Sequence, residues 1–249
     1  MFTPGKHPPL YQQLADPMYA FNRGFTMNLA VVERQKAFWP GHRLLTSGAL
    51  ADVCRNQNDL AADGNPEVNY WNGIIPMLSF PANTDYWIAS PSTKVSSQDS
   101  NVFWTWIRFN DVSAANRYIC GRYDTPNHYS WSFTCTTPNT LSVNLSTDGT
   151  NITTFNKTVS AYTLTSWHFV AFEHYAATRV RIWIDDDMSE WTVGIPGALV
   201  NGNSTFRLGQ ATKSDMILPA WNGGEHYSNP TIDCRSWLNV WYTLTRMMV

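Results

Sequence analysis

Charged side chains are scarce in this sequence. Lysine, arginine, aspartate and glutamate make up 14% of the 249 residues, whereas a typical soluble domain has about 25%. The formal net charge is −2, and the isoelectric point is near 6.3. Proteins that bind phosphate backbones usually carry a basic stripe and an isoelectric point above about 9. We therefore expect neither nucleic acid nor an anionic membrane surface as a partner.

Long apolar runs are also absent. No stretch approaches the roughly 18 apolar residues that a membrane-spanning helix needs. The N-terminal residues, MFTPGKHPP, lack the apolar segment of a signal peptide. The expectation is a chain without membrane insertion that is assembled in the cytoplasm of the cell that makes it.

Cysteine is rare, and its spacing argues against a zinc site. Cys54, Cys120, Cys135 and Cys234 form no C-x-x-C or Cys/His pattern. Cys120 and Cys135 could face each other across a hairpin. Because there is no export signal, two buried thiols are favoured over a disulfide, although the sequence is compatible with both states.

Proline and glycine break every periodic pattern in the first 45 residues. A short helix at residues 28–37 is the one regular element expected there. The segment is nevertheless rich in aromatic side chains, which are costly to leave in water. We interpret residues 1–45 as an extended arm that packs either on its own domain or on a neighbouring subunit, and residues 46–249 as one β-domain. The aromatic residues of this arm are Phe2, Tyr11, Tyr19, Phe21, Phe25, Phe38 and Trp39.

Alternating side chains after residue 84 predict a series of strands. In residues 103–109, Phe103, Ile107 and Phe109 share one face and two tryptophans share the other, which is typical of a central strand. Residues 141–145 also alternate, and Asp148-Gly149 follows them with the positive φ angles of a tight hairpin turn. Further strands are predicted at residues 168–174, 179–184, 206–208 and 238–244.

Over roughly residues 75–246, the order of these motifs resembles laminin-G-like members of the concanavalin A-like lectin and glucanase superfamily. The most specific segments are residues 167–172, WHFVAF, and residues 179–185, RVRIWID. They are similar to the family's W-H-x-V strand and its L-x-L-Y-V-D-G partner strand. Further matches lie at residues 85–91, 103–108, 119–122, 131–133, 206–209 and 232–241.

The resemblance implies an all-β fold, with two antiparallel sheets in a jelly-roll sandwich that binds sugars or proteins on its concave face or rim loops. Calcium often accompanies this superfamily, so a structural calcium ion stays open and no other cofactor is expected. The acidic residues that could hold it are Asp185, Asp186 and Asp187. Asp186-Asp187 stands where the family commonly has a glycine turn, so the loop after Ile184 is expected to be built differently.

Catalytic patterns are missing. Glucanases of this superfamily place an E-x-D-x-E string on one strand, and a retaining glycanase needs two carboxylates about 5 Å apart. The sequence contains no such string, no G-x-S-x-G elbow and no glycine-rich phosphate loop. We therefore predict a protein that is not an enzyme.

Two segments combine aromatic and polar side chains in the manner of glycan-binding loops. The competing interpretation is that such rings pin a long loop to the sandwich, and for the segment at residues 219–227 this interpretation is favoured. The candidate ligand-binding residues are Trp221, Asn222, Glu225, His226 and Tyr227 in that segment, with Asp124 and His128 at a hairpin tip.

Laminin-G-like modules without export signals recur among virion proteins. The resemblance therefore implies a non-enzymatic virion structural protein, such as a phage capsid decoration or fibre-like surface component, assembled in the host cytoplasm. Its partners would be other virion proteins or further copies of this chain in a homo-oligomer. The alternative is a carbohydrate-binding adhesin that recognises a cell-surface glycan, and a glycoside hydrolase ranks below both.

Overall fold

The structure is a computed structural model. It describes residues 37–39, 44–52, 58–71, 75–89, 98–110, 117–124, 128–137, 139–158, 164–185, 187–200, 204–210 and 213–223, with the backbone alone at residues 38, 75, 128, 137 and 218–223. These residues belong to one compact unit, Gln35–Ser228. Of the helix predicted at residues 28–37, residues 28–36 lie outside the described residues and Ala37 is in a strand. The predicted strand at residues 238–244 also lies outside the described residues. No helix long and apolar enough to cross a membrane occurs in the described part of the chain.

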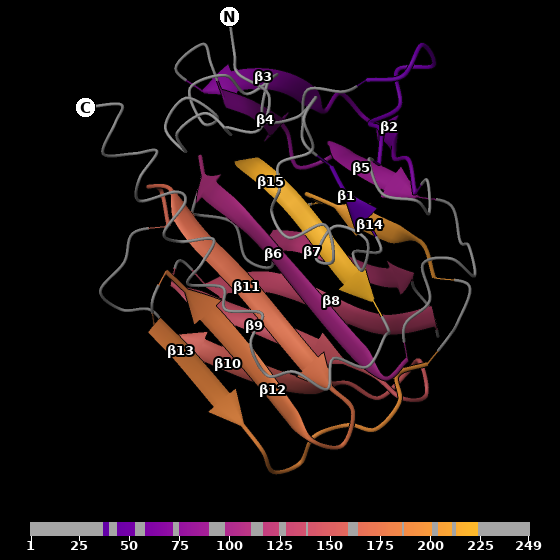
Figure 1. Cartoon of the computed structure of the whole chain (residues 1–249), viewed down its shortest axis with the longest axis vertical. Helices are drawn as coiled ribbons and strands as arrows, with labels where there is room; N and C mark the ends of the chain where they lie inside the picture. Colours follow the sequence, from indigo (N-terminus) through magenta and orange to yellow (C-terminus); the bar gives the residue numbers. More distant parts are fainter. Residues whose placement is uncertain are drawn as a thin grey trace, which may run out of the picture. The chain divides into compact units, whose positions relative to one another are not determined.

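The fold is a two-layered antiparallel β-sandwich with jelly-roll topology, which confirms the predicted fold class (Figure 1). The sheet nearer the viewer in Figure 1, called the front sheet, has β1 (Ala37–Phe38) paired with β15 outside the main strand order. Its strand order is β13 (Asp187–Trp191), β12 (Arg179–Ile184), β11 (His168–Tyr175), β6 (Ser100–Phe109), β15 (Ser214–Gly223), β4 (Ile75–Phe80) and β3 (Glu67–Trp71).

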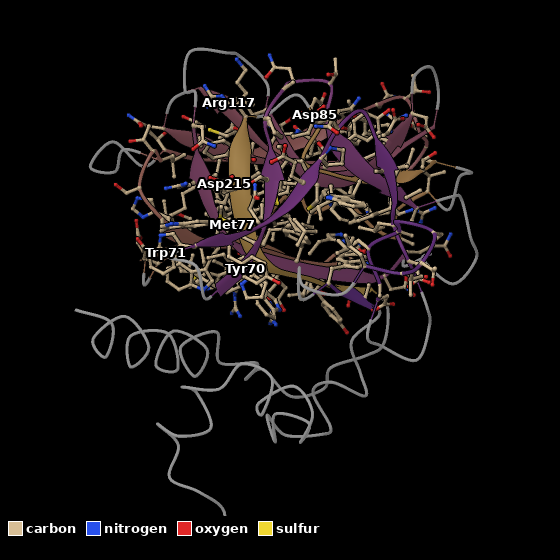
Figure 2. The ribbon with its side chains drawn as sticks, turned by 90° about the horizontal axis from the view of Figure 1, so that it is seen from above. Tyr70, Trp71, Met77, Asp85, Arg117 and Asp215 are labelled. Carbon is tan, nitrogen blue, oxygen red and sulfur yellow. The ribbon has the colours of Figure 1, made fainter. Side chains whose placement is uncertain are left out.

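The back sheet lies behind it in the same view. Its strand order is β10 (Thr153–Thr158), β9 (Thr140–Leu145), β8 (His128–Thr137), β7 (Arg117–Asp124), β14 (Phe206–Leu208), β5 (Tyr86–Ala89) and β2 (Ala61–Asp63). Figure 2 shows the layers from the side, with Tyr70, Trp71 and Met77 toward the front-sheet side and Asp85 and Arg117 toward the back-sheet side.

The predicted central strand is central. β6 lies between β11 and β15, and Phe103, Ile107 and Phe109 point into the core without significant exposure. On the opposite face of β6, Trp104 and Trp106 pack against Phe169 of β11. Both faces of this strand therefore bury bulky rings, as the alternation of its side chains predicts.

The core between the sheets is built from aromatic and branched side chains of both inner faces. Trp131 of the back sheet packs against Phe172 of the front sheet, with ring centroids 5.2 Å apart. It also contacts Phe206 of β14 at 6.2 Å. Cys120 and Cys135 are buried as free thiols, because the register places Phe133 opposite Cys120 and Arg117 opposite Cys135.

The hairpin after β9 is confirmed, but its turn is longer than predicted. β9 and β10 pair from Leu145 and Thr153 onward, so residues 146–152 form the connection. Gly149 has the expected positive φ of 85°. Asp148 instead folds the loop with its side chain, whose Oδ1 accepts the amide hydrogens of Thr150 and Asn151 at 2.8 and 2.7 Å. These hydrogen bonds lower the pKa of Asp148 well below its ordinary value.

The second predicted hairpin, β11 with β12, is also confirmed. Val180, Ile182 and Ile184 are buried in the core, as their alternation predicts. After Ile184 the chain turns at Asp185, whose φ of 51° is the left-handed conformation that a glycine would adopt more easily. Because Asp186 lies outside the described residues, the expectation that this loop is built differently from the family's glycine turn stays a prediction.

The last residues of the predicted arm belong to the sandwich. Trp39 is only 1% exposed, stacks on Phe206 with centroids 5.3 Å apart and donates a hydrogen bond from Nε1 to the Asn58 carbonyl at 3.0 Å. Ala37 is buried in the same core. The backbone of Phe38 lies in β1, whereas Phe2, Tyr11, Tyr19, Phe21 and Phe25 lie outside the described residues. The boundary at residue 45 and the placement of the arm stay predictions.

Candidate functional site

A cluster of tyrosine, arginine and aspartate side chains lies on the outer face of the back sheet. We call it the tyrosine patch, and its members come from four strands that are adjacent in the order β2, β5, β14 and β7. The patch consists of Asp63, Tyr86, Tyr118, Tyr123, Asp124 and Arg207.

Strand alternation explains why Arg207 and Tyr86 point outward, whereas Tyr118 and Tyr123 share a face because the register of β7 with β8 shifts twice between them. Phe206 and Leu208 of β14 are buried in the core, so Arg207 between them lies on the outer face. Trp87 of β5 likewise points inward, which leaves Tyr86 on the outer face. Asp63 lies directly opposite Tyr86 in the pairing of β2 with β5.

Planar groups in the patch form a stacked row. The guanidinium carbon of Arg207 lies 5.7 Å from the ring centroid of Tyr86 and 5.3 Å from that of Tyr123. Tyr123 in turn stacks on Tyr118 with centroids 4.4 Å apart and an interplanar angle of 22°. The row therefore runs in the order Tyr86, Arg207, Tyr123 and Tyr118, and it is held together by cation–π and ring stacking.

Arg207 is fixed by hydrogen bonds as well as by the rings. Its Nη2 donates to Oδ1 of Asp124 at 2.6 Å, and its Nη1 donates to Oε1 of Gln210 at 3.2 Å. Oδ2 of Asp124 accepts from the amide nitrogen and the hydroxyl of Thr205 at 2.8 and 3.0 Å. The side chains of Arg207 and Asp124 remain 21% and 25% exposed, so a ligand can reach this ion pair.

The hydroxyls of Tyr86 and Tyr123 are hydrogen-bonded. The Tyr86 hydroxyl donates to Oδ2 of Asp63 at 2.5 Å, and this bond, followed by burial, raises the pKa of Tyr86. The Tyr123 hydroxyl donates to Gln210, and burial raises the pKa of Tyr123 far above its ordinary value. These hydroxyls therefore act as hydrogen-bonding groups rather than as bases at neutral pH.

Small polar side chains continue this outer face toward β10. Asn144 of β9 donates from Nδ2 to the Ser132 hydroxyl at 3.2 Å, and Thr154 of β10 donates to Oδ1 of Asn144 at 2.8 Å. The Tyr129 hydroxyl is hydrogen-bonded to Ser132. Serine, threonine and asparagine groups thus border the tyrosine patch on the side of β8 and β9.

Gly121 lies between Arg207 and Ser132 in the pairing of β14, β7 and β8. A Cβ atom at this position would lie 2.7 Å from the Trp131 carbonyl oxygen and 2.9 Å from the Ser132 Cα. The close approach of the two strands therefore requires glycine.

Of the predicted ligand-binding residues, Asp124 belongs to the patch. Its partner in the prediction, His128, lies directly opposite it in the β7 and β8 pairing, but the side chain of His128 is outside the described set. The role of both residues in ligand binding stays a prediction.

The other segment predicted as a glycan-binding loop, residues 219–227, begins as a strand. β15 continues to Gly223, with Trp221 opposite Phe103 and Asn222 opposite Val102, so the expectation of a loop at residues 219–223 is wrong. A break in register between Ile217 and Ala220 accommodates Pro219, which has no amide hydrogen for the ladder. The backbone alone is described for Trp221 and Asn222, and Glu225, His226 and Tyr227 lie outside the described residues.

The acidic residues that could hold calcium are bound to different parts of the sandwich. Asp185 accepts from the Phe169 amide at 3.0 Å and contacts Nδ1 of His168 at 2.8 Å. Asp187 pairs with Nζ of Lys157 at 3.0 Å, and Asp186 lies outside the described residues. No group of three His, Cys, Asp or Glu side chains arranged to hold a metal ion occurs in the described segments.

Sequence reasoning did not identify Tyr86, Tyr118, Tyr123 and Arg207 as site residues. The signal available was the alternation in residues 206–208, FRL. In residues 117–124, RYICGRYD, regular alternation would place Tyr118 and Tyr123 on opposite faces, and only the shifts in register between β7 and β8 bring them to one face. Alternation places each side chain on a face, but it does not reveal that β14 pairs between β5 and β7. That pairing joins residues more than a hundred positions apart along the chain, as for Leu208 with Trp87.

No family model and no curated protein sequence matches this chain. Solved structures do match it in fold. The binding domain of Paraclostridial Mosquitocidal Protein 1 has a TM-score of 0.66 at 9% identity and covers 85% of this chain and 53% of that one. The botulinum neurotoxin serotype D ligand-binding domain, in complex with N-acetylneuraminic acid, has a TM-score of 0.64 at 12% identity and covers 80% of this chain and 49% of that one.

The binding domain of botulinum neurotoxin DC, in complex with rat synaptotagmin II, has a TM-score of 0.63 at 14% identity, with coverage of 84% and 52%. This chain therefore spans about half the length of the structures that it matches. Identities this low show the fold alone. The chain is a jelly-roll β-sandwich of the kind found in these receptor-binding domains of toxins.

Proposed function

We propose that the protein is a non-enzymatic binding module that recognises carbohydrate through the tyrosine patch. The observation that carries the proposal is the stacked row of Tyr86, Arg207, Tyr123 and Tyr118, with carboxylates beside it. Sugar-binding sites combine aromatic rings, against which the C–H face of a sugar packs, with polar groups that hydrogen-bond its hydroxyls. The patch offers both kinds of group on one outer sheet face.

The rigidity of the patch supports the proposal. Its side chains stand on paired strands, and the stacking and hydrogen bonds described above fix their orientation. A site that is already ordered loses less conformational entropy on binding, which matters most for weakly bound ligands such as sugars. The similar structures support the same proposal, because one is a ligand-binding domain in complex with N-acetylneuraminic acid and the others are binding domains.

A panel of immobilised glycans tests the proposal. We expect wild-type protein to bind a subset of the panel and Tyr118→Ala to lose most of this binding, since Tyr118 stands at one end of the stacked row. Tyr70→Ala is the matched control, because Tyr70 is a 55% exposed tyrosine of the front sheet, away from the patch (Figure 2). Equal binding by the two variants, both folded by circular dichroism, would contradict the proposal.

The virion interpretation stays a prediction. A capsid decoration or fibre-like component, its location in a virion and its oligomeric partners find no specific support among the described residues. The alternative expectation, an adhesin-like module for a cell-surface glycan, agrees better with the similar structures. For this reason we place carbohydrate binding first.

A further inference from the structure

We infer that the tyrosine patch selects uncharged sugars and discriminates against acidic ones such as sialylated or sulfated glycans. The inference rests on the proposed function and concerns the ligand class of the same site. It is argued from the charges of the patch and from the hydrogen bonds that its groups already make.

The cation of the patch is already neutralised. An acidic sugar is usually recognised by an arginine whose N–H groups are free to bind a carboxylate in a bidentate manner. In this patch, Nη2 and Nη1 of Arg207 are directed to Asp124 and Gln210. Its guanidinium carbon also lies over the rings of Tyr86 and Tyr123. Arg207 therefore holds the row together and does not offer a ligand two free N–H groups for a bidentate hydrogen bond.

The formal charge of the patch is negative. Its two carboxylates, Asp63 and Asp124, outnumber its single guanidinium, that of Arg207, and two minus one leaves an excess of one negative charge. A second arginine, Arg122 of β7, points into the sandwich and is 2% exposed, so it cannot contact a ligand on the outer face. An acidic sugar on the row would approach the exposed carboxylate of Asp63, and like charges at short range repel.

The exposed carboxylate of Asp63 offers the patch an acceptor for a ligand. The hydroxyl hydrogens of Tyr86 and Tyr123 are donated to Asp63 and Gln210. Oδ2 of Asp63 accepts the Tyr86 bond, whereas Oδ1 of this exposed residue accepts none among the described groups. A ligand that supplies donors matches this surface, and the hydroxyl groups of a neutral sugar are such donors.

The experiment compares sugars in matched pairs on the full-length protein. Neutral oligosaccharides that bind, for example ones ending in galactose, are titrated beside the same oligosaccharides carrying a sialic acid or a sulfate. We expect the acidic member to bind at least about tenfold more weakly at low salt. The affinity for the neutral member should change little between low and high salt, because its binding forms no ion pair.

The variant Asp63→Asn separates charge from shape. It removes the excess negative charge but keeps an oxygen that can accept the Tyr86 hydroxyl. The ratio of the affinity for the neutral sugar to that for the acidic sugar should therefore fall by about threefold or more, while the fold is retained.

Equal or tighter binding of the acidic member by the wild-type protein would overturn the inference and leave the proposed function intact. Failure of every glycan to bind at the patch would overturn the proposed function itself.

Discussion

A histidine and an asparagine face each other inside the sandwich without completing their hydrogen bonds. His174 of β11 and Asn101 of β6 are directly opposite, and neither is exposed. Nε2 of His174 contacts the Pro196 carbonyl at 3.3 Å, but its Nδ1 and both polar atoms of the Asn101 side chain have no hydrogen-bond partner among the described residues. Buried polar groups of this kind are costly, and the cost rises further if the imidazole becomes charged.

This arrangement makes the stability of the sandwich depend on pH. Burial lowers the pKa of His174, and the Pro196 carbonyl, Asp99 and Glu173 oppose that shift only in part. Below the ordinary histidine pKa of about 6.5, the unfolded chain therefore binds more protons than the folded one. We predict that the free energy of unfolding falls as pH decreases through about 6.5, by up to about 1.4 kcal/mol per pH unit, and levels off below the folded-state pKa.

Denaturant unfolding between pH 8 and pH 5 measures this dependence. The variant His174→Gln keeps a hydrogen-bonding side chain that does not titrate, so the part of the slope due to His174 should disappear. An unchanged slope in this variant would show that a group other than His174 causes the pH dependence.

At the scale of the strands, one edge of the sandwich is closed by side chains that cross between the sheets. Lys157 of β10 donates to the Ser189 hydroxyl of β13 at 3.0 Å and pairs with Asp187 of the same strand. Phe155 of β10 packs against Trp191 of β13, with centroids 5.7 Å apart. β10 and β13 are the edge strands of the two sheets, so these contacts join the layers where no further strand covers them in the described part of the chain.

The lysine in this closure needs its carboxylate partner. The Lys157 side chain is 4% exposed, whereas that of Asp187 is 52% exposed. Removing the partner as Asp187→Ala leaves a buried ammonium group, and we predict a loss of about 1–2 kcal/mol in the free energy of unfolding. The double variant Lys157→Met with Asp187→Ala should recover part of that loss, because it also removes the buried charge. A double variant less stable than Asp187→Ala would contradict this reasoning, with thermal unfolding as the measurement.

The sequence predicts these strands better than it predicts how they pair. The alternation in residues 103–109 and 179–184 identifies β6 and β12 and their inward faces, because the side-chain period of a strand is fixed by its geometry. The length of the loop after β9 was underestimated, since its geometry depends on the hydrogen bonds of the Asp148 side chain rather than on a two-residue turn. The tyrosine patch was missed apart from Asp124, because it depends on the pairing of β14 with two strands far away in the sequence.

For the whole molecule, residues 37–39 of the predicted arm contribute contacts to the sandwich. Trp39 fills part of the core beside Phe206, and Ala37 opens a strand that pairs with Trp221 of β15. Chains that start at residue 35 and at residue 46 both lack residues 1–34, but they differ in these contacts. We predict that the shorter chain is less stable by about 3–5 kcal/mol, the usual cost of deleting a buried tryptophan. Equal midpoints in denaturant unfolding would contradict the prediction.

β14 is the strand that connects β7 with β5, and it is three residues long. The two remaining parts of the described back sheet, β10 to β7 on one side and β5 with β2 on the other, meet across it. A ligand that contacts both Tyr118 and Tyr86 would span this short strand and hold the two parts of the sheet together. The binding surface exists only while β14 is paired with both of its neighbours. Ligand binding would therefore require the folded back sheet, and no linear peptide from this chain would bind the ligand in the same way. A saturating sugar would accordingly protect the back sheet against opening at its narrowest point.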